Sequence, residues 1–194
     1  MPASVLYMSM SLDGYIAGPD DGPHNPGGDG FLRLHHWGVT PEGQSFRPPG
    51  PAAQLIDEMT ATGAVLAGRR TVEQVDHWDG DHHRGVPIFV PSSRPPGPTA
   101  GRYPLVTYVA DGIASAMAQA KAAAGERNVM VQGADIAQRA LEAGVLDEME
   151  IHQVPVLFGG GRRLFDVLPG HVELEVARVI DTPEATHIHY VVRR

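Results

Sequence analysis

Phosphate binding is the first chemistry that the residues of this chain suggest. Gly68, Arg69, Arg70 and Thr71 follow the apolar run at 64–67 and lead into a helical pattern. A glycine turn before a helix offers free backbone N–H groups and the positive end of the helix dipole, and an adjacent guanidinium binds phosphate well. The pattern predicts a phosphate site, with a helix start and solvated arginines as the competing interpretation.

A second polar turn follows the apolar run at 86–90. It contains Ser92, Ser93 and Arg94. Two hydroxyls and a guanidinium at a strand end suit a phosphate monoester, such as the 2′-phosphate that distinguishes NADPH from NADH. A polar turn before a proline-rich loop would use the same residues. The phosphate interpretation of this second turn therefore depends on the presence of the first one.

A third turn opens a helical pattern after the apolar run at 128–132. It consists of Gly133, Ala134, Asp135 and Ile136. A single glycine at such a turn lets the backbone approach a pyrophosphate closely, although the Asp135 side chain would also serve as a helix N-cap. The sequence lacks GxGxxG, so the ordinary dinucleotide fingerprint is absent.

The elements that must position these turns predict a doubly wound α/β fold. Short, nearly continuous apolar runs are typical of parallel strands covered on both faces. They span 5–10, 64–67, 86–90, 105–110, 128–132 and 149–157, with helical patterns at 52–59, 113–120 and 136–141. The carboxyl ends of parallel strands meet at one edge of a sheet, so the three turns should line one site for an extended, phosphate-bearing ligand.

The C-terminal segments differ from these runs. Residues 172–176 and 188–192 alternate between apolar and polar types, which predicts half-exposed antiparallel strands joined by turn residues at 181–184. We therefore expect a mostly parallel twisted sheet of about eight strands, with helices on both faces and a C-terminal antiparallel hairpin. No linker divides the chain, so we expect a single domain over 1–194.

Composition excludes several classes of protein. The 194 residues carry a net charge of −8 and no cysteine, which removes disulfides, thiolate metal sites and thiol nucleophiles. An acidic balance without a Lys/Arg-rich run predicts no nucleic-acid partner. The N-terminal apolar run lacks a basic flank and is broken by Ser9, Ser11 and Asp13, so we expect no signal peptide, no membrane span and a cytoplasmic protein.

Several segments together resemble a known family. They are SLDGYIAG at 11–18, AGRRT at 67–71, VPSSRP at 90–95, VQGADIAQRAL at 131–141 and GVLDEMEIHQVPVLFGGGRRLF at 144–165. In this order, and over nearly the whole chain, they are similar to the dihydrofolate reductase-like superfamily. The resemblance is greatest to its bacterial branch related to the C-terminal reductase domain of the bifunctional riboflavin-biosynthesis deaminase/reductase. It implies the dihydrofolate reductase-like fold and NADPH as cofactor.

The resemblance also implies roles for individual residues. The family's phosphate-binding helix start would correspond to Gly68, Arg69 and Thr71, and the 2′-phosphate would be surrounded by Ser92, Ser93 and Arg94. The pyrophosphate would lie over Gly133, Ala134, Asp135 and Ile136. The nicotinamide would be flanked by Ser9, Ile16 and Ala17. The loop 18–30, in which eleven of thirteen residues are Gly, Pro or Asp, is similar in position to the family's mobile loop. Its composition suits a lid.

Departures from the family's pattern make the riboflavin-pathway reaction a less favoured function for this chain. Val131 and Gln132 stand where the riboflavin-pathway reductases usually carry an acidic residue. Asp29 lies where the folate enzymes have a carboxylate that orients the pterin, so we predict a partly buried catalytic acid there, with helix capping as the alternative. Asp13, in SLDG, is predicted to bond the turn backbone instead.

A histidine-rich segment raises the question of a metal site. Its titratable residues are His77, Asp79, Asp81, His82 and His83, with His35 and His36 earlier in the chain. Their spacing matches no regular ligand pattern such as HExxH, so we predict no metal and interpret them as loop residues or a patch facing the substrate. Trp37 and Trp78 would either stack on an aromatic substrate or pack in the core.

The leading hypothesis is an NADPH-dependent oxidoreductase that transfers hydride to a conjugated heterocycle, such as a pterin- or pyrimidine-like small molecule. Hydride transfer needs orientation and water exclusion more than side-chain chemistry. The alternatives are a non-catalytic nucleotide-binding or regulatory protein, a 5-amino-6-(ribosylamino)uracil-type reductase of riboflavin biosynthesis, and use of a flavin or deazaflavin in the same cleft. We also expect a homodimer in which the C-terminal strands cover an exposed face.

Overall fold

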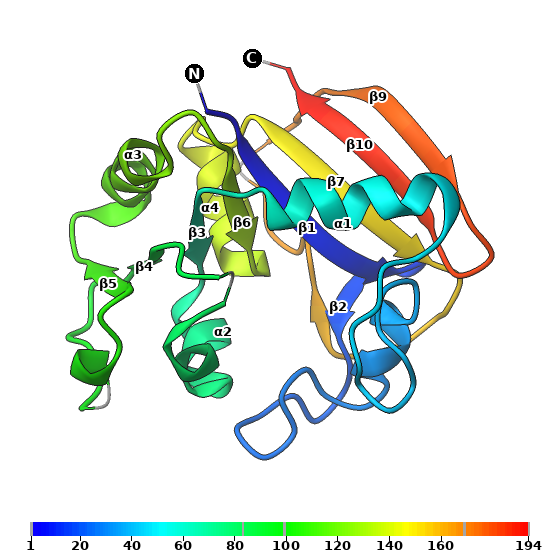
Figure 1. Cartoon of the computed structure of the whole chain (residues 1–194), viewed down its shortest axis with the longest axis horizontal. Helices are drawn as coiled ribbons and strands as arrows, with labels where there is room; N and C mark the ends of the chain where they lie inside the picture. The colour runs from blue at the N-terminus through cyan, green and yellow to red at the C-terminus, as the bar shows by residue number, and fades with distance from the viewer. Residues whose placement is uncertain (1, 83, 99, 169, 194) are drawn as a thin grey trace.

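The computed structural model describes residues 2–82, 84–98, 100–168 and 170–193. These residues form an eight-stranded sheet. Its strands, in spatial order, are β5 (Val106–Val109), β4 (Ile88–Pro91), β3 (Ala64–Ala67), β6 (Val129–Gln132), β1 (Ser4–Ser11), β7 (Glu148–Val154), β10 (Thr186–Val192) and β9 (Leu174–Asp181). The first six run parallel, and β10 and β9 are added antiparallel at one edge (Figure 1). The predicted mostly parallel sheet with a C-terminal hairpin is confirmed.

Prolines shorten two of the predicted strands. β4 starts at Ile88 rather than at residue 86, because Pro87 has no N–H to donate to the ladder. β7 ends at Val154 rather than at residue 157, because Pro155 follows it. β9 instead begins at residue 174 and continues to residue 181, beyond the predicted end at 176.

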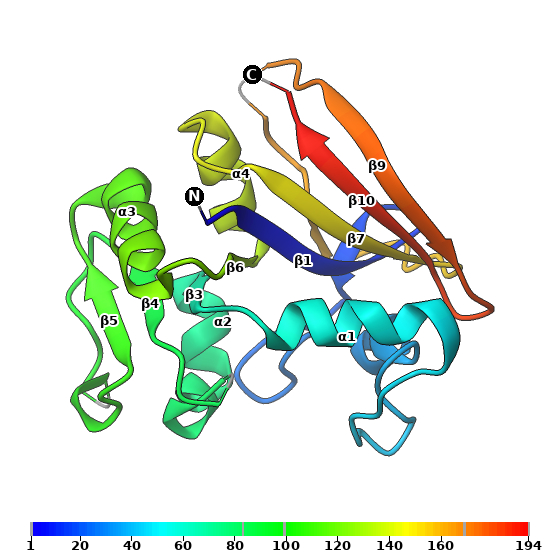
Figure 2. The ribbon, with the colours of Figure 1, turned by 45° about the horizontal axis from the view of Figure 1, so that its top comes forward.

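Helices cover both faces of the sheet, as predicted. α3 (Gly112–Ala124) and α4 (Ala134–Glu142) pack on one face, whereas α1 (Ala53–Thr60) and α2 (Arg69–Gln74) pack on the other. Figure 2 shows α1 and α4 on opposite sides of β1. Asp111 occupies the N-cap position of α3, although its side chain makes no capping hydrogen bond.

The described residues also form four short 3-10 helices. They are η1 (Phe31–His35), η2 (Gly50–Ala52), η3 (Asp76–Gly80) and η4 (Ala100–Arg102). η1 and α1 lie over the face of the sheet that β1, β7 and β10 form, where Leu34 and Leu55 join one apolar cluster. Among the described residues, no helix has the length and apolar character needed to cross a bilayer.

A small second sheet pairs β2 (Tyr15–Ala17) with β8 (Arg162–Arg163), and no sequence pattern predicted it. The glycines before β8 explain how the two segments come so close. Gly161 has φ +116°, and a Cβ there would lie 2.1 Å from the Ala17 carbonyl oxygen. Any other residue would push β8 away, so the glycine run serves a close backbone approach.

Asp13 fixes the neighbouring turn from the other side. Its carboxylate accepts hydrogen bonds from the Ser11 hydroxyl at 2.6 Å and from the Gly159 N–H at 2.7 Å. These bonds, led by that of Ser11, lower the pKa of Asp13 to about 2. The predicted structural role is confirmed, although the bonded backbone belongs to the turn after β7 and not to SLDG itself.

The alternating pattern predicted half-exposed strands, and the structure shows which face of the hairpin is covered. The histidine face of β10 is covered by η1 and α1, and His187 is only 1% exposed. The apolar residues Val176 and Val179 of β9 are instead more than half exposed, at 56% and 55%. Alternation predicted half-exposed strands but could not show which face is covered, because the covering segment comes from distant residues.

Candidate active site

One cavity of about 1050 Å³ collects most of the residues predicted to bind a ligand. Its lining includes Ser9, Ile16, Ala17, Gly68, Arg69, Thr71, Ser92, Arg94, Gly133, Ala134 and Asp135. The turns after β3, β4 and β6 therefore meet at the carboxyl edge of the sheet. The arginine end of the cavity is the part formed by Gly68, Arg69, Thr71, Gly133 and Ala134.

Two helices begin at the arginine end. α2 follows Gly68 and α4 follows Gly133, so the first N–H groups of both helices, which have no intrahelical acceptor, lie at the cavity wall. Gly133 has φ +96°, and a Cβ there would lie 3.2 Å from the Thr71 Oγ1. The glycine lets the two helix starts approach each other, which gives this wall a positive polarity.

Arg69 organises the turn after β4. Its Nη1 donates to the Ser92 hydroxyl at 3.1 Å, and to the carbonyl oxygens of Arg94 at 3.0 Å and Pro95 at 2.8 Å. Its Nε donates to Glu73 at 2.7 Å. The Arg69 side chain is mostly buried, whereas Arg94 is exposed, so Arg69 shapes the turn and Arg94 is the cation that faces solvent.

Asp21 ties the loop 18–30 to the arginine end. Its carboxylate accepts hydrogen bonds from Arg70 at 2.8 Å and from Gln74 at 2.6 Å, and the Arg162 Nε lies 3.7 Å away. Partial burial opposes the charged form, but the bonds from Gln74 and Arg70 outweigh it and lower the pKa of Asp21. The loop therefore covers part of the cavity, with Asp21 and Gly27 in its lining.

Two predicted cofactor residues lie outside the cavity lining. Ser93 is exposed, whereas Ile136 is fully buried in the core, and neither belongs to the cavity lining. Ile136 lies beneath Gly68, where a Cβ would be 3.4 Å from its side chain. Asp135 does line the cavity but lies within the first turn of α4, so its predicted N-cap alternative is wrong: Gly133 is the N-cap.

The position of Asp29 differs from the prediction. Its carboxylate is exposed, accepts a hydrogen bond from the Asn25 side chain at 3.0 Å, and does not line the cavity. The predicted partial burial is wrong, because the loop 18–30 folds on itself and turns this side chain to solvent. Asp29 caps no helix either, since Gly30 is the residue before η1.

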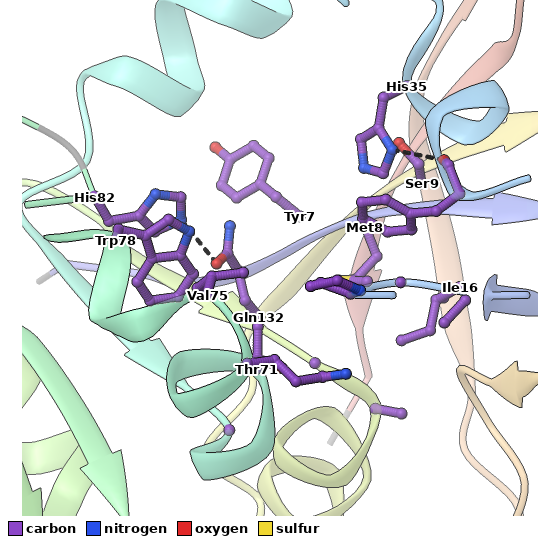
Figure 3. Close-up of a pocket in the computed structure, with 18 of the residues that line it drawn as sticks. Tyr7, Met8, Ser9, Ile16, His35, Thr71, Val75, Trp78, His82 and Gln132 are labelled. Carbon is purple, nitrogen blue, oxygen red and sulfur yellow. Dashed lines mark hydrogen bonds between the residues drawn. The ribbon is translucent and has the colours of Figure 1, made fainter. Parts of the chain in front are cut away.

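The other end of the cavity carries imidazoles and one indole. Ser9, His35, Trp37 and His152 form it, and this group is the histidine end. In Figure 3, the ring of Tyr7 lies between His35 and Ser9 on one side and the pair His82 and Gln132 on the other.

Neutral, hydrogen-bonded rings build the histidine end. The Trp37 Nε1 donates to the Ser9 hydroxyl at 3.0 Å, and the Trp37 ring packs 4.1 Å from that of His152. Behind them the Nδ1 atoms of His152 and His187 lie 2.9 Å apart. Burial holds the pKa of His152 well below its usual value, and burial also lowers the pKa values of His187 and His35. All three imidazoles are therefore uncharged near neutral pH.

Sequence reasoning missed His152 and His187 as site residues. Both lie inside strands, where a polar residue in an apolar run is easily interpreted as an outward-facing one. The signal that could have identified these residues is the strand register, because His152 pairs with Ser9 of β1 and with His187 of β10. That register becomes visible only when three distant segments are aligned side by side.

A stacked pair lies at the middle of the cavity. Trp78 and His82 stack with ring centres 4.0 Å apart and an angle of 1° between their planes. The His82 Nε2 lies 2.9 Å from the Gln132 Oε1, so the residue that departs from the family's pattern supports this stack (Figure 3). Trp37 and Trp78 both line the cavity and also pack against core residues.

An unusual turn directs the side chains of the histidine-rich segment to different neighbours. Residues 76–79 all have positive φ, between 43° and 60°. His77 consequently faces Tyr108, whose hydroxyl is 3.0 Å from its Nε2, whereas His82 faces Gln132. His83 lies outside the described residues. Within the described ranges, no group of three or more His, Cys, Asp or Glu side chains is arranged to hold a metal ion.

Comparison with known proteins identifies relatives over the whole chain. The model of the RibD C-terminal domain family matches residues 2–188. An uncharacterised protein of Bacillus subtilis (strain 168), YwjB, is 25% identical over 193 residues, with 97% of both chains covered.

Solved structures share the fold. A protein from Shewanella sp. PV-4, provisionally assigned to riboflavin biosynthesis, superposes with a TM-score of 0.74 at 25% identity and 99% coverage of both chains. A pyrimidine reductase-like protein from Corynebacterium diphtheriae gives 0.65 at 12% identity, over 100% of this chain and 92% of its own. A deaminase and 5-amino-6-(5-phosphoribosylamino)uracil reductase from Thermotoga maritima gives 0.58 at 14% identity, over 99% of this chain and 57% of its own.

Proposed function

We propose, from the premise that the chain belongs to the RibD C-terminal domain family, that it is an NADPH-dependent reductase of a small conjugated heterocycle. The pyrophosphate would lie at the arginine end and the nicotinamide near Ile16 and Ala17. The heterocycle would then occupy the histidine end.

The pair of helix starts at the arginine end is the observation that carries this proposal. Two N-termini, a glycine that admits close backbone approach and the exposed Arg94 lie on one cavity wall. A dinucleotide with a 2′-phosphate is an extended polyanion, so this wall fits its charge and its shape. The Glu73 carboxylate beside Arg69 accepts a hydrogen bond from that guanidinium. The exposed guanidinium of Arg94 would then face the phosphate.

Orientation and water exclusion are the chemistry that this chain supplies. NADPH, when bound, supplies the hydride. The dinucleotide would be held by the backbone of the helix starts and by the turn that Arg69 holds. The hydrogen bonds of Asp21 would hold the loop 18–30 over the dinucleotide, and breaking them would release the loop. Tyr7 and Trp37 would confine the heterocycle in a largely apolar space.

Uncharged groups at the histidine end favour a neutral heterocycle over a protonated pterin ring. Asp21 and Asp135 are the acidic residues in the described lining, and Asp21 is bonded at the arginine end. A non-catalytic nucleotide-binding protein is the second candidate, favoured by the exposure of Asp29, which leaves that carboxylate unable to assist protonation.

Binding and turnover measurements on the full chain test the proposal. We expect saturable binding of NADPH with lower affinity for NADH and for oxidised flavins or deazaflavins, and oxidation of NADPH, followed by absorbance, with members of a panel of pyrimidine- and pterin-type heterocycles. NADPH binding without any oxidation would favour the non-catalytic candidate. Tighter binding of flavin than of NADPH would overturn the cofactor assignment.

We also propose a homodimer through the hairpin. The exposed Leu174, Val176 and Val179 pair with Val192, Tyr190 and Ile188, so they lie on the face of the hairpin away from α1. An apolar sheet face of this kind is typical of a subunit interface. Light scattering at micromolar concentration should give twice the mass of the chain, and a Val176→Asp variant should give the mass of a monomer.

A further inference from the structure

We infer that Ser9 and His152 are a hydrogen-bond donor and acceptor that recognise the C=O and N–H groups of a neutral cyclic amide, and that His187 is the positioning residue that fixes the His152 tautomer. The inference rests on the proposed function, because it deepens the assignment of the histidine end to the substrate. It concerns recognition and requires no proton transfer.

The hairpin turn sets the tautomer of His187. The Thr182 hydroxyl donates its one proton to the Ala185 carbonyl at 2.8 Å, and the same oxygen lies 3.4 Å from the His187 Nε2. With its proton committed, the Thr182 oxygen can only accept from the imidazole. A neutral His187 therefore carries its proton on Nε2 and presents a lone pair at Nδ1.

The tautomer of His152 follows from that of His187. Their Nδ1 atoms are 2.9 Å apart, so one must donate to the other. Since the His187 Nδ1 is the acceptor, the His152 Nδ1 carries the proton. A neutral His152 then has a lone pair at Nε2, which has no hydrogen-bond partner among the described residues, and the side chain is part of the cavity lining.

Ser9 supplies the complementary donor. Its Oγ accepts the Trp37 Nε1–H at 3.0 Å, and no acceptor for its own hydroxyl proton exists within the described part of the chain. Ser9 is 5% exposed and lines the cavity. Since a buried hydroxyl without an acceptor is costly, a bound carbonyl oxygen at this point would be stabilised.

The strand register holds donor and acceptor side by side. Ser9 and His152 are paired positions on the parallel strands β1 and β7, so their side chains leave the same face about 4.8 Å apart. A cyclic amide offers its C=O and N–H on adjacent ring atoms of one edge. The spacing lets both groups of that edge be bonded at once.

Neighbouring charges do not compete for this edge. Glu150, which precedes His152 on the same face of β7, accepts bonds from Arg178 at 2.9 Å and from His189 at 2.8 Å. It is absent from the described cavity lining. His35 donates its Nδ1–H to the Phe31 carbonyl at 3.2 Å, so it adds a second neutral acceptor and no charge. The histidine end therefore selects uncharged N–H donors.

Nitrogen-15 spectra of the histidine rings of the full chain test the tautomers, with 2-pyridone as the probe of a cyclic amide. We expect His152 as the Nδ1–H form and His187 as the Nε2–H form, and we expect 2-pyridone to shift the His152 Nε2 signal. N-methyl-2-pyridone, which has no N–H, should leave that signal in place. The opposite tautomers, or equal responses to the two probes, would overturn the inference.

Variants separate recognition from folding. His152→Asn keeps a donor near His187 but has no acceptor that reaches as far as Nε2, and we expect it to weaken 2-pyridone binding about fivefold or more. Ser9→Ala should weaken it by a smaller factor, and both should melt as cooperatively as the parent chain. The control is His171→Asn, which removes an exposed imidazole. Equal binding by His152→Asn and the control would contradict the inference.

NADPH titration of the same proteins distinguishes the two proposals. Probe discrimination without NADPH binding would refute the reductase assignment and leave the recognition pair standing. NADPH-dependent turnover that is unchanged in His152→Asn would support the reductase assignment and refute the recognition pair.

Discussion

The arginine end and the histidine end share one cavity, yet they are built in different ways. At the arginine end, the groups proposed to bind the dinucleotide are backbone N–H groups and guanidiniums at turns that directly follow strands. At the histidine end, the groups proposed to bind the substrate are side chains inside β1 and β7, completed by η1 and supported by β10. One end depends on local turn geometry, and the other depends on the register of distant strands.

This difference has a chemical counterpart. Guanidiniums keep their charge over the accessible pH range, so the arginine end should bind anions with little dependence on pH. The histidine end consists of rings that burial keeps neutral, and its properties should change with pH and with single hydrogen bonds. Variants at each end should therefore affect different measurements.

Gly133→Val should give the largest effect. Valine at φ +96° is strained by about 1–3 kcal/mol, and its Cβ would lie close to the Thr71 hydroxyl, 3.2 Å away, between the helix starts. We expect NADPH affinity to fall roughly 100-fold in a fluorescence titration, equivalent to about 2.8 kcal/mol. Gly144→Val is the matched control, since φ there is +64° and no atom lies within 4 Å of its Cβ. Equal losses of NADPH affinity in both variants would remove Gly133 from the binding wall.

The pH dependence of stability should report on the imidazoles of β7 and β10, beside and behind the histidine end. Hydrogen bonds from Glu148 and Glu150 raise the pKa of His189 to about 9. Because the folded pKa exceeds the unfolded one, near 6.5, the stabilisation is complete below pH 6.5 and is lost as the pH rises through 9. We expect a loss of about 2–3 kcal/mol in the free energy of unfolding across that range.

The buried imidazoles give the acid side of the same profile. Burial lowers the pKa values of His152 and His187, so stability should also fall as the pH drops below 6.5, where the unfolded chain takes up protons first. Urea unfolding between pH 5 and pH 9 measures both limbs. His189→Gln should flatten the alkaline limb only, and a variant profile identical to the parent's would contradict the assignment.

Arg69→Ala should lower NADPH affinity about tenfold and NADH affinity much less. The variant releases the turn that carries Ser92 and Arg94, where the 2′-phosphate is proposed to bind. Paired titrations with the two nucleotides measure the difference, with the exposed Arg102→Ala as control. Losses of equal size for NADPH and NADH would place the 2′-phosphate elsewhere.

Trp37→Phe should give the smallest change, and only at the histidine end. The variant keeps an aromatic ring against His152 but removes the bond to Ser9. We expect the KM for a heterocycle to change about threefold to tenfold, with NADPH affinity unaltered. A change in NADPH affinity of the same size would show that the two ends do not act separately.

The same difference explains how far sequence reasoning reached. The sheet, the helices on both faces and the turns at Gly68 and Gly133 were predictable because each depends on a few consecutive residues. Ser93 and Ile136 were included because a whole turn was assigned to the ligand, whereas Ser93 is exposed outside the cavity lining and Ile136 is buried in the core.

The histidine end was beyond such reasoning. His152 and His187 are separated by 35 residues, and their contact exists only through the pairing of β7 with β10. Asp29 was chosen by analogy of position, but the loop 18–30 bonds its own residues and exposes that carboxylate. Local patterns carry no information on which of two strand faces a distant segment will cover.

The most direct test of the account is a crystal structure of the full chain grown with NADPH. We expect the pyrophosphate at the starts of α2 and α4 and the 2′-phosphate near Ser92 and Arg94. We expect the nicotinamide beside Ile16, with the space above it bounded by Ser9 and His152. A dinucleotide bound outside this cavity, or one whose nicotinamide fills the histidine end, would contradict the account.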